Sequence, residues 1–224
     1  METRTVETRT HGRYLVRPPR PGGPSPLLIG FHGYRENAAS HMAMLTQIAG
    51  TEGWLIAAVQ GLHRFYTKGG AVVASWMTKE DRELAIADNI AYVSQVIDAI
   101  RAEFPAGDVL AFAGFSQGAA MAFRAAAHFG ANALIVVGGD VPPDIAAGTP
   151  VALPPVLYGR GCRDGLYTAE QHARDVSTLE RLGATVESVT FDGGHDMAPE
   201  FLAAAARTIG RFRGGLLLNR PEAL

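Results

Sequence analysis

A serine stands at the centre of the pentapeptide Gly114-Phe115-Ser116-Gln117-Gly118, between an apolar run and an alanine-rich run. The two runs are typical of a buried strand and a helix, so the pentapeptide predicts a sharp strand-to-helix turn with the serine at its apex. Such a turn strains the serine backbone and brings the flanking chain close, which favours glycine at 114 and 118. The pattern indicates a nucleophile elbow, and the plainer alternative is a glycine-rich turn that happens to hold a serine.

A serine nucleophile needs a base that accepts its proton, and one of the seven histidines stands in the expected place. His195, in Gly193-Gly194-His195-Asp196, follows a predicted strand and comes after Ser116 in the chain. Five others lie on predicted helices, too early in the chain or in an irregular stretch: His41, His128, His172, His11 and His63. We therefore predict that His195 is the general base.

The histidine must be held in one tautomer by a carboxylate. Asp164 follows the second strand after the elbow, where the chain order of nucleophile, acid and histidine places the acid in hydrolases with such an elbow. Asp140 follows the intervening strand and stays open as an alternative, although it also fits a turn before two prolines. Three further aspartates are less suited by their positions: Asp144, Asp192 and Asp196.

A tetrahedral intermediate also needs two N–H donors for its oxyanion. One donor is expected from the backbone of Gln117, the residue after the serine. The other is expected from the loop after the first central strand, His32-Gly33-Tyr34, where the Tyr34 N–H is the better candidate. The alternative for this loop is a tight turn with no catalytic part.

The elements that would position these residues alternate between strand and helix. Strands are predicted at 27–31, 54–59, 109–113, 133–137, 156–158 and 186–191. Helices are predicted at 38–49, from a capping box at Thr78 to Asp81 through 104, from the elbow to 129, at 168–182 and at 198–212. This order predicts an α/β fold, a mostly parallel central sheet with helices on both faces, whose ligands bind at the carboxyl ends of the strands.

The length predicts one domain over residues 1–224, and the proline-rich connector near the start marks no boundary because too little chain precedes it to form a core. Residues 1–25 are expected to form an edge hairpin, with strands at 6–10 and 14–16, and a proline-rich connector. Residues 214–224 form a tail with three consecutive leucines, which we expect to dock back or to contact a partner chain, so a homodimer is left open.

Two connections bear on the substrate pocket. Residues 138–155 are too few for a helical cap, so no cap domain is expected above the site. Residues 62–77 are expected to be irregular and carry Phe65, Tyr66, Trp76 and Met77. We expect these side chains to form one wall of a shallow acyl pocket, and the alternative is that they only pack the loop onto the domain.

Composition excludes several other classes of function. The net charge is −2 and no basic cluster is present, so binding to nucleic acid is not expected. Cys162 is the only cysteine, expected to be a small buried residue, and the histidines and acids show no metal-ligand spacing, so neither a disulfide, a metal nor a cofactor is implied. No signal peptide or transmembrane run is visible, so we expect a cytoplasmic protein.

With these motifs in place, the chain resembles the α/β-hydrolase superfamily, and within it the phospholipase/carboxylesterase family that includes acyl-protein thioesterases. The resemblance covers about residues 26–213 and rests on four motifs: Phe31-His32-Gly33-Tyr34, the serine pentapeptide, Gly161-Cys162-Arg163-Asp164 and Gly193-Gly194-His195. Two positions depart from the family pattern: Leu166-Tyr167 replaces Val-Pro, and Tyr34-Arg35 replaces a segment with a second glycine. Both departures bear on the substrate pocket rather than the triad.

The resemblance implies a serine carboxylesterase that hydrolyses small to medium acyl esters through an acyl-enzyme intermediate. Alternatives on the same fold are an acyl thioesterase, a lysophospholipase and a peptidase or depolymerase. An alternative from another class is a binding module that has lost the chemistry, and the competent residues at all three triad positions argue against it.

Overall fold

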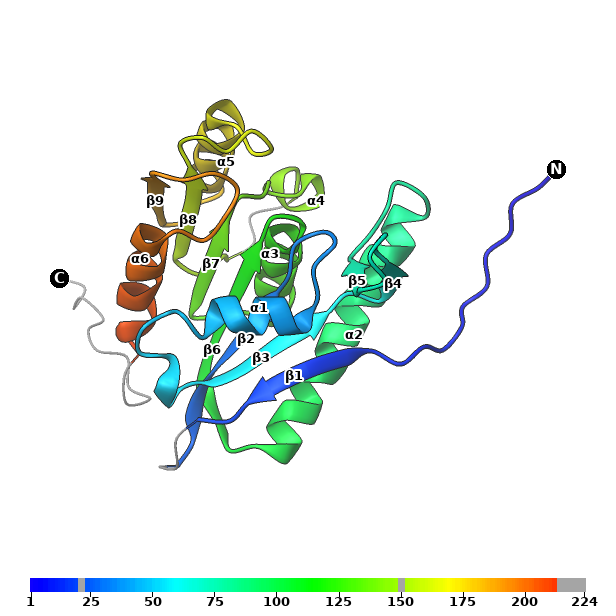
Figure 1. Ribbon diagram of the computed structural model, residues 1–224, viewed down its shortest axis with the longest axis horizontal. Helices are drawn as coiled ribbons and strands as arrows, with labels where there is room; N and C mark the ends of the chain where they lie inside the picture. The colour runs from blue at the N-terminus through cyan, green and yellow to red at the C-terminus, as the bar shows by residue number, and fades with distance from the viewer. Residues whose placement is uncertain (20–22, 149–151, 213–224) are drawn as a thin grey trace.

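The computed structural model describes residues 1–19, 23–148 and 152–212, and it contains a seven-stranded sheet in the order β1-β3-β2-β6-β7-β8-β9 (Figure 1). The strands are β1 (Arg13–Arg17), β2 (Ser25–Phe31), β3 (Leu55–Gln60), β6 (Ala106–Phe115), β7 (Ala133–Val137), β8 (Val156–Gly161) and β9 (Val186–Phe191). Strand β1 pairs antiparallel with β3, and every other pairing in this sheet is parallel. The predicted mostly parallel sheet is therefore confirmed.

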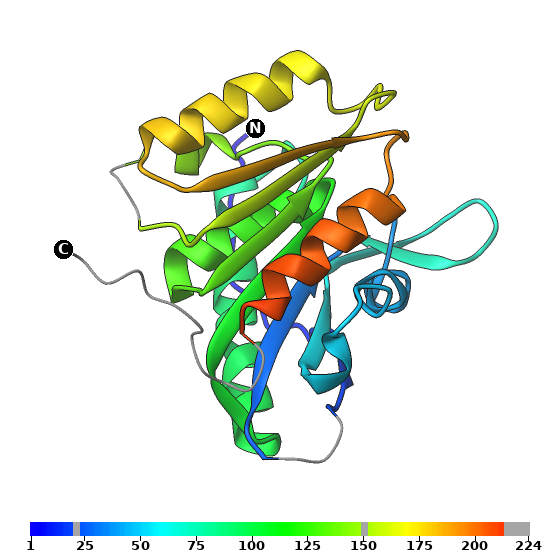
Figure 2. The same cartoon turned by 90° about the vertical axis from the view of Figure 1, so that its left-hand side faces the viewer.

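Helices cover both faces of the sheet (Figure 2). They are α1 (Ala38–Leu45), α2 (Arg82–Glu103), α3 (Gln117–Phe129), α4 (Pro143–Ala146), α5 (Ala169–Arg181) and α6 (Pro199–Gly210), with a short 3₁₀ helix at Thr51–Gly53. One apolar cluster joins α2, α3 and α5 to the sheet, and a second joins α1 and α6 to the opposite face. The central strands β2 and β3 are buried along their whole length, as expected for parallel strands covered on both sides.

The parallel connections place the carboxyl ends of β2, β6, β7, β8 and β9 at one edge of the sheet. The loops that follow these strands carry the residues singled out in the sequence, including His32, Ser116, Asp140, Asp164 and His195. Side chains that lie up to 163 positions apart in the sequence, such as His32 and His195, thus share one edge. This is the edge where α/β folds bind their ligands.

The predicted N-terminal hairpin is wrong. Only β1 is a strand, and residues 1–12 have no regular structure. These twelve residues are all exposed and alternate threonine with charged residues, so they offer no apolar face to bury. Strand β1 instead pairs with β3 and forms one edge of the sheet, as the edge prediction had it. The tail at 214–224 lies outside the described residues.

The segment 62–77 is also more regular than the sequence indicated. It forms a two-stranded antiparallel hairpin of β4 (His63–Tyr66) and β5 (Val72–Ser75). The predicted capping box is wrong as well. Helix α2 begins at Arg82, its N-cap residue Asp81 has φ 48°, and the Asp81 side chain accepts no hydrogen bond from a backbone N–H of the first turn. The Thr78 hydroxyl is instead hydrogen-bonded to the backbone of Glu80, within its own turn.

The elbow has the backbone that its glycines predict. Ser116 lies between β6 and α3 with φ 53° and ψ −122°, a conformation that a residue with a side chain adopts only under strain. A Cβ on Gly114 would overlap the Gly118 carbonyl, and a Cβ on Gly118 would overlap the Phe31 carbonyl at the end of β2. The expectation that both positions require glycine is therefore confirmed by backbone contacts that cannot move aside.

His41 is an unusual member of the core, where α1 packs on β2. Its ring lies over Gly30, whose missing side chain leaves the space that the ring fills. The side chain is fully buried, and neither ring nitrogen has a hydrogen-bond partner among the described residues. Burial, assisted by the neighbouring His32, lowers the pKa of His41 to about 3.

We predict that Gly118→Ala lowers the free energy of unfolding by about 1–3 kcal/mol, because the new methyl group must displace the backbone of β2. Urea unfolding followed by circular dichroism measures the change. The matched control is Gly53→Ala, where a Cβ meets nothing within 4 Å. A Gly118→Ala protein as stable as the control would contradict the close packing of the elbow.

We predict that His41 makes the protein less stable in mild acid. The unfolded chain takes up a proton on this histidine near pH 6.5, whereas the folded protein does so only near pH 3, so stability is lost as pH falls between these values. From pH 8 to pH 5 the loss from this residue is roughly 2 kcal/mol. Urea unfolding at both pH values should show a smaller pH dependence in His41→Leu, and an unchanged dependence would reject the assignment.

Candidate active site

Three side chains from three separate loops form one hydrogen-bonded chain. The Nε2 atom of His195 lies 2.9 Å from the Ser116 hydroxyl, and its Nδ1 atom lies 2.8 Å from Oδ2 of Asp164. An ionised carboxylate only accepts hydrogen bonds, so the imidazole proton is on Nδ1 and Nε2 is free to accept the serine proton. The structure thus brings together the three residues that the sequence singled out, in the geometry of a nucleophile, a base and an orienting acid.

The environment of Asp164 keeps its carboxylate charged. Burial alone would raise its pKa, but hydrogen bonds from the Tyr167 N–H, from His195 and from the Leu166 N–H together lower the pKa below the usual value. The side chain is almost completely buried, with 1% exposed, while that of His195 is 20% exposed. A fixed negative charge therefore lies behind the imidazole, and the opposite side of the ring faces the nucleophile.

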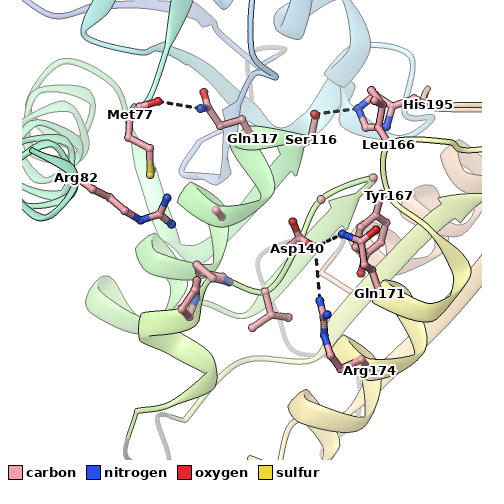
Figure 3. A pocket seen from close by; sticks show the side chains of 16 residues that line it. Met77, Arg82, Ser116, Gln117, Asp140, Leu166, Tyr167, Gln171, Arg174 and His195 are labelled. Carbon is pink, nitrogen blue, oxygen red and sulfur yellow. Dashed lines mark hydrogen bonds and ion pairs between the residues drawn. The ribbon is translucent and has the colours of Figure 1, made fainter. Parts of the chain in front are cut away.

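Asp140, the alternative acid, is placed elsewhere. Its carboxylate accepts a hydrogen bond of 3.2 Å from the Gln171 amide and lies 3.8 Å from the Arg174 guanidinium (Figure 3). Burial and the nearby Asp175 raise its pKa, against the effect of Arg174 and Gln171. The Nδ1–H of His195 donates its hydrogen bond to Asp164, so the geometry favours Asp164 as the acid.

The loop after β2 is fixed by the His32 ring. The Gly61 N–H donates to Nε2 at 3.0 Å, so the ring proton is on Nδ1, which donates to the Gly33 carbonyl at 2.7 Å. Burial lowers the pKa of His32 and keeps the ring neutral in this arrangement. Because the peptide bond is trans, the Tyr34 N–H points away from the carbonyl that His32 holds. The ring thereby orients one of the two expected oxyanion donors.

Both expected oxyanion donors, the N–H groups of Tyr34 and Gln117, have no acceptor among the described residues. The loop that carries Tyr34 lies against the serine, since a Cβ on Gly33 would be 3.2 Å from Cβ of Ser116. A carboxylate oxygen of Glu36 accepts the Gly33 N–H at 2.7 Å, and burial raises the pKa of Glu36. Free N–H groups beside a nucleophile can stabilise the negative charge of a tetrahedral intermediate.

Trp76 does not line a pocket, contrary to the sequence prediction. Its side chain is completely buried, packs edge-on against Phe31 and donates from Nε1 to the His32 carbonyl at 2.8 Å. The Gln117 side chain accepts the Trp76 N–H at 2.9 Å and donates to the Met77 carbonyl at 3.1 Å. These contacts fasten the segment after β5 to both the elbow and the oxyanion loop, which explains why an indole is buried here.

A cavity of about 530 Å³ opens beside the serine and histidine (Figure 3). Of the four residues predicted to form its wall, Met77 lines it, whereas Tyr66 is exposed on β4 and Phe65 packs against the Tyr34 ring at 5.8 Å. Hairpin formation explains the difference, because β4 and β5 pair with each other and turn their residues alternately to the two sides. The predicted aromatic wall is therefore wrong at this cavity.

Sequence reasoning missed most of the residues that do line the cavity. They come from α2, the segment after β7, the loop after β8 that carries Asp164, and α5. They include Arg82, Val141, Leu166, Tyr167, Gln171 and Arg174. Two of them, Leu166 and Tyr167, are positions where the chain departs from the family pattern. That departure was the one feature of the sequence that pointed to these residues as part of the pocket. The helix residues carried no signal, because an exposed arginine or glutamine on a helix has no distinctive pattern.

A metal site is not apparent in the described part of the chain. Over residues 1–19, 23–148 and 152–212, His, Cys, Asp and Glu side chains form no group of three that could hold a metal ion. Cys162 is exposed, so the prediction of a buried cysteine is wrong, and it follows the strand end at Gly161 on a surface turn. None of the described helices is both long and apolar enough to cross a membrane.

Solved structures of esterases and thioesterases share this architecture. Esterase PE8 has a TM-score of 0.71 and 22% identity, covering 90% of this chain and 99% of its own. Acyl-protein thioesterase 2 of Zea mays has a TM-score of 0.68 and 19% identity, covering 89% and 98%. A phospholipase/carboxylesterase from Dyadobacter fermentans DSM 18053 has a TM-score of 0.68 and 20% identity, covering 92% and 99%.

No protein-family model matches the chain, and no curated protein sequence matches it significantly. At identities of 19–22% the likeness to the solved structures concerns the fold. The sheet order, the helices on both faces and the serine elbow after β6 agree with that likeness. The chain therefore has the α/β-hydrolase fold, in the form found in these esterases and thioesterases.

Proposed function

We propose that this protein is a serine hydrolase of the phospholipase/carboxylesterase family that cleaves carboxylic esters through an acyl-enzyme intermediate. The observation that carries the proposal is the continuous hydrogen-bonded chain from Asp164 through His195 to Ser116 at a strained elbow. The esterase and thioesterase neighbours support it through the shared fold. A binding module would have no need to keep a buried, charged carboxylate on the histidine.

The reaction follows from the positions of the protons. His195 accepts the Ser116 proton on Nε2 while the oxygen attacks the ester carbonyl, and the resulting imidazolium is stabilised by the Asp164 carboxylate. The oxyanion forms beside the N–H groups of Tyr34 and Gln117. His195 then gives its proton to the leaving alcohol, and water releases the acid from the serine by the same steps in reverse order.

The cavity supports a preference for small to medium acyl groups. Its volume of about 530 Å³ is that of a small-ligand site, and it has polar walls at Asp140 and Gln171 beside the apolar side chains of Met77 and Leu166. Each CH₂ that enters contact with the apolar part adds roughly 0.8 kcal/mol of binding, and groups that extend beyond it add nothing. A cytoplasmic location, a single domain over 1–224, a homodimer and the absence of nucleic-acid binding stay predictions from the sequence.

The nucleophile is tested with Ser116→Ala. We expect kcat for p-nitrophenyl butyrate to fall on the order of 10³-fold or more, because triad members act as a unit, and labelling by a fluorophosphonate probe to disappear. Circular dichroism checks that the variant folds. Labelling of Ser116→Ala by the probe would contradict the assignment of the nucleophile.

Wild-type kcat/KM over a series from acetyl to palmitoyl esters should peak at short or medium length. A kcat/KM that continues to rise up to the palmitoyl ester would contradict the preference for short and medium acyl groups.

The acid is tested by comparing Asp164→Asn with Asp140→Asn. An asparagine at 164 would present its amide to Nδ1 and favour the wrong imidazole tautomer, so kcat should fall by about 10³–10⁴-fold. The matched change at 140 removes a carboxylate that contacts Gln171 and lies near Arg174, and its kcat should fall far less. The opposite ranking would assign the orienting role to Asp140.

A further inference from the structure

On one side of the cavity, the arginine is held by acids of the protein. Asp140 lies on the wall formed by α5 and the segment after β7, where the Arg174 guanidinium lies 3.8 Å away and the Gln171 amide donates to it. Arg174 also contacts the buried Asp175 at 3.1 Å. The positive charge on this wall is therefore held by two carboxylates of the protein itself, and no cation is left over for a ligand.

The opposite wall carries an arginine without such a match. Arg82, at the start of α2, lines the same cavity as Ser116 and His195, and Figure 3 shows its side chain reaching toward the middle of the pocket. Among the described residues no carboxylate lies within 4.0 Å of it, and it makes no side-chain hydrogen bond. Its charge is thus directed into the space where a substrate would lie.

An aspartate close enough to interact with Arg82, Asp144, is already engaged. Asp144 accepts two parallel hydrogen bonds from Arg124, from Nε at 2.8 Å and from Nη2 at 2.7 Å, and Arg124 is almost completely buried. The charge of Arg82 helps to lower the pKa of Asp144, but Arg82 makes no hydrogen bond to it. Because Asp144 is bonded to Arg124, it does not serve as a hydrogen-bonded counter-ion for Arg82.

The position of Arg82 is not explained by helix stability. A cation in the first turn of a helix is disfavoured by the helix dipole, by a few tenths of a kcal/mol up to about 1 kcal/mol. The side chain is also half-buried, which limits its hydration. A guanidinium kept at such a place, beside a nucleophile, is well suited to bind a planar anion such as a carboxylate.

We propose that Arg82 is a specificity-determining residue that binds a carboxylate on the substrate, so that the preferred esters are anionic. The proposal rests on the proposed function and names the substrate class of the same site. The carboxylate would lie on the Arg82 side of the cavity, away from the Asp140 carboxylate, whose like charge repels it. An anionic ester with its carbonyl at Ser116 would then be oriented by its second charged group.

The test compares two substrates with the same four-carbon acyl chain, p-nitrophenyl hemisuccinate and p-nitrophenyl butyrate. For Arg82→Gln, the ratio of the two kcat/KM values should fall by about tenfold or more, since a charge-assisted hydrogen bond is lost. Arg82→Lys should keep part of the ratio, and added salt should lower it in the wild type. Arg101→Gln, in the last turn of the same helix, is the control and should leave the ratio unchanged.

A second pair of substrates places the carboxylate on the alcohol part: p-acetoxybenzoate against phenyl acetate. If Arg82→Gln lowers kcat/KM for the charged ester more than for the neutral ester in either pair, the proposal is supported. The pair that shows this effect tells which part of the ester occupies the cavity. Ratios equal to those of the wild type in both pairs would overturn it. An equal loss for charged and neutral esters would also overturn it, because Arg82 would then serve the structure rather than recognition.

Binding separates this proposal from the proposed function. Calorimetry with monomethyl succinate on Ser116→Ala, and on the Ser116→Ala, Arg82→Gln double variant, needs no turnover. Weaker binding by about tenfold in the double variant supports the carboxylate site even if no ester is hydrolysed. Equal binding by the two proteins rejects the site, even if the wild type is an active esterase.

Discussion

Strain in the backbone of Ser116 is the constraint on which the rest of the site depends. The residue has φ 53° because β6 ends and α3 begins within one residue of it, and the turn is held by the Val137 carbonyl, which accepts the Ser116 N–H at 3.0 Å. Strand β2 supplies the other support, since Gly118 packs directly against the Phe31 carbonyl. The unfavourable conformation persists because several neighbouring elements enforce it.

Hydrogen bonds connect the elbow to the segment after β5 and to the loop after β2. The Gln117 side chain bonds the segment after β5, and Trp76 of that segment bonds the His32 carbonyl. The neutral His32 ring then orients the peptide between Gly33 and Tyr34. Ser116 and the loop after β2 therefore belong to one hydrogen-bonded unit built from β2, β5 and α3.

Electrostatics divide the aspartates around the site into different roles. Asp164 is buried but receives two backbone N–H groups, so it remains charged behind His195. Asp140 lies next to a buried carboxylate, Asp175, and has a raised pKa despite its arginine. Two aspartates that follow neighbouring strands thus differ because one loop turns its N–H groups toward the carboxylate and the other does not.

The sequence by itself determined the alternation of strands and helices, the elbow and the histidine. These depend on local causes: apolar runs bounded by turns, two glycines at fixed spacing and a histidine after a strand. Asp164 was preferred from chain order, and the fold then showed that its loop is the one that reaches the imidazole. Two local patterns misled, at the N-terminal hairpin and at the capping box, because a strand or a cap needs a partner that the pattern does not specify.

Tertiary structure alone decided which side chains form the cavity and what holds the oxyanion loop. The burial of Trp76, the exposure of Tyr66 and the placement of Arg82 on the same cavity as Ser116 all depend on how the hairpin and α2 pack above the sheet. Such residues come from segments far apart in the sequence, and their types are common on surfaces and in cores alike. Their roles arise from the neighbours that packing gives them, and a single sequence carries no record of those neighbours.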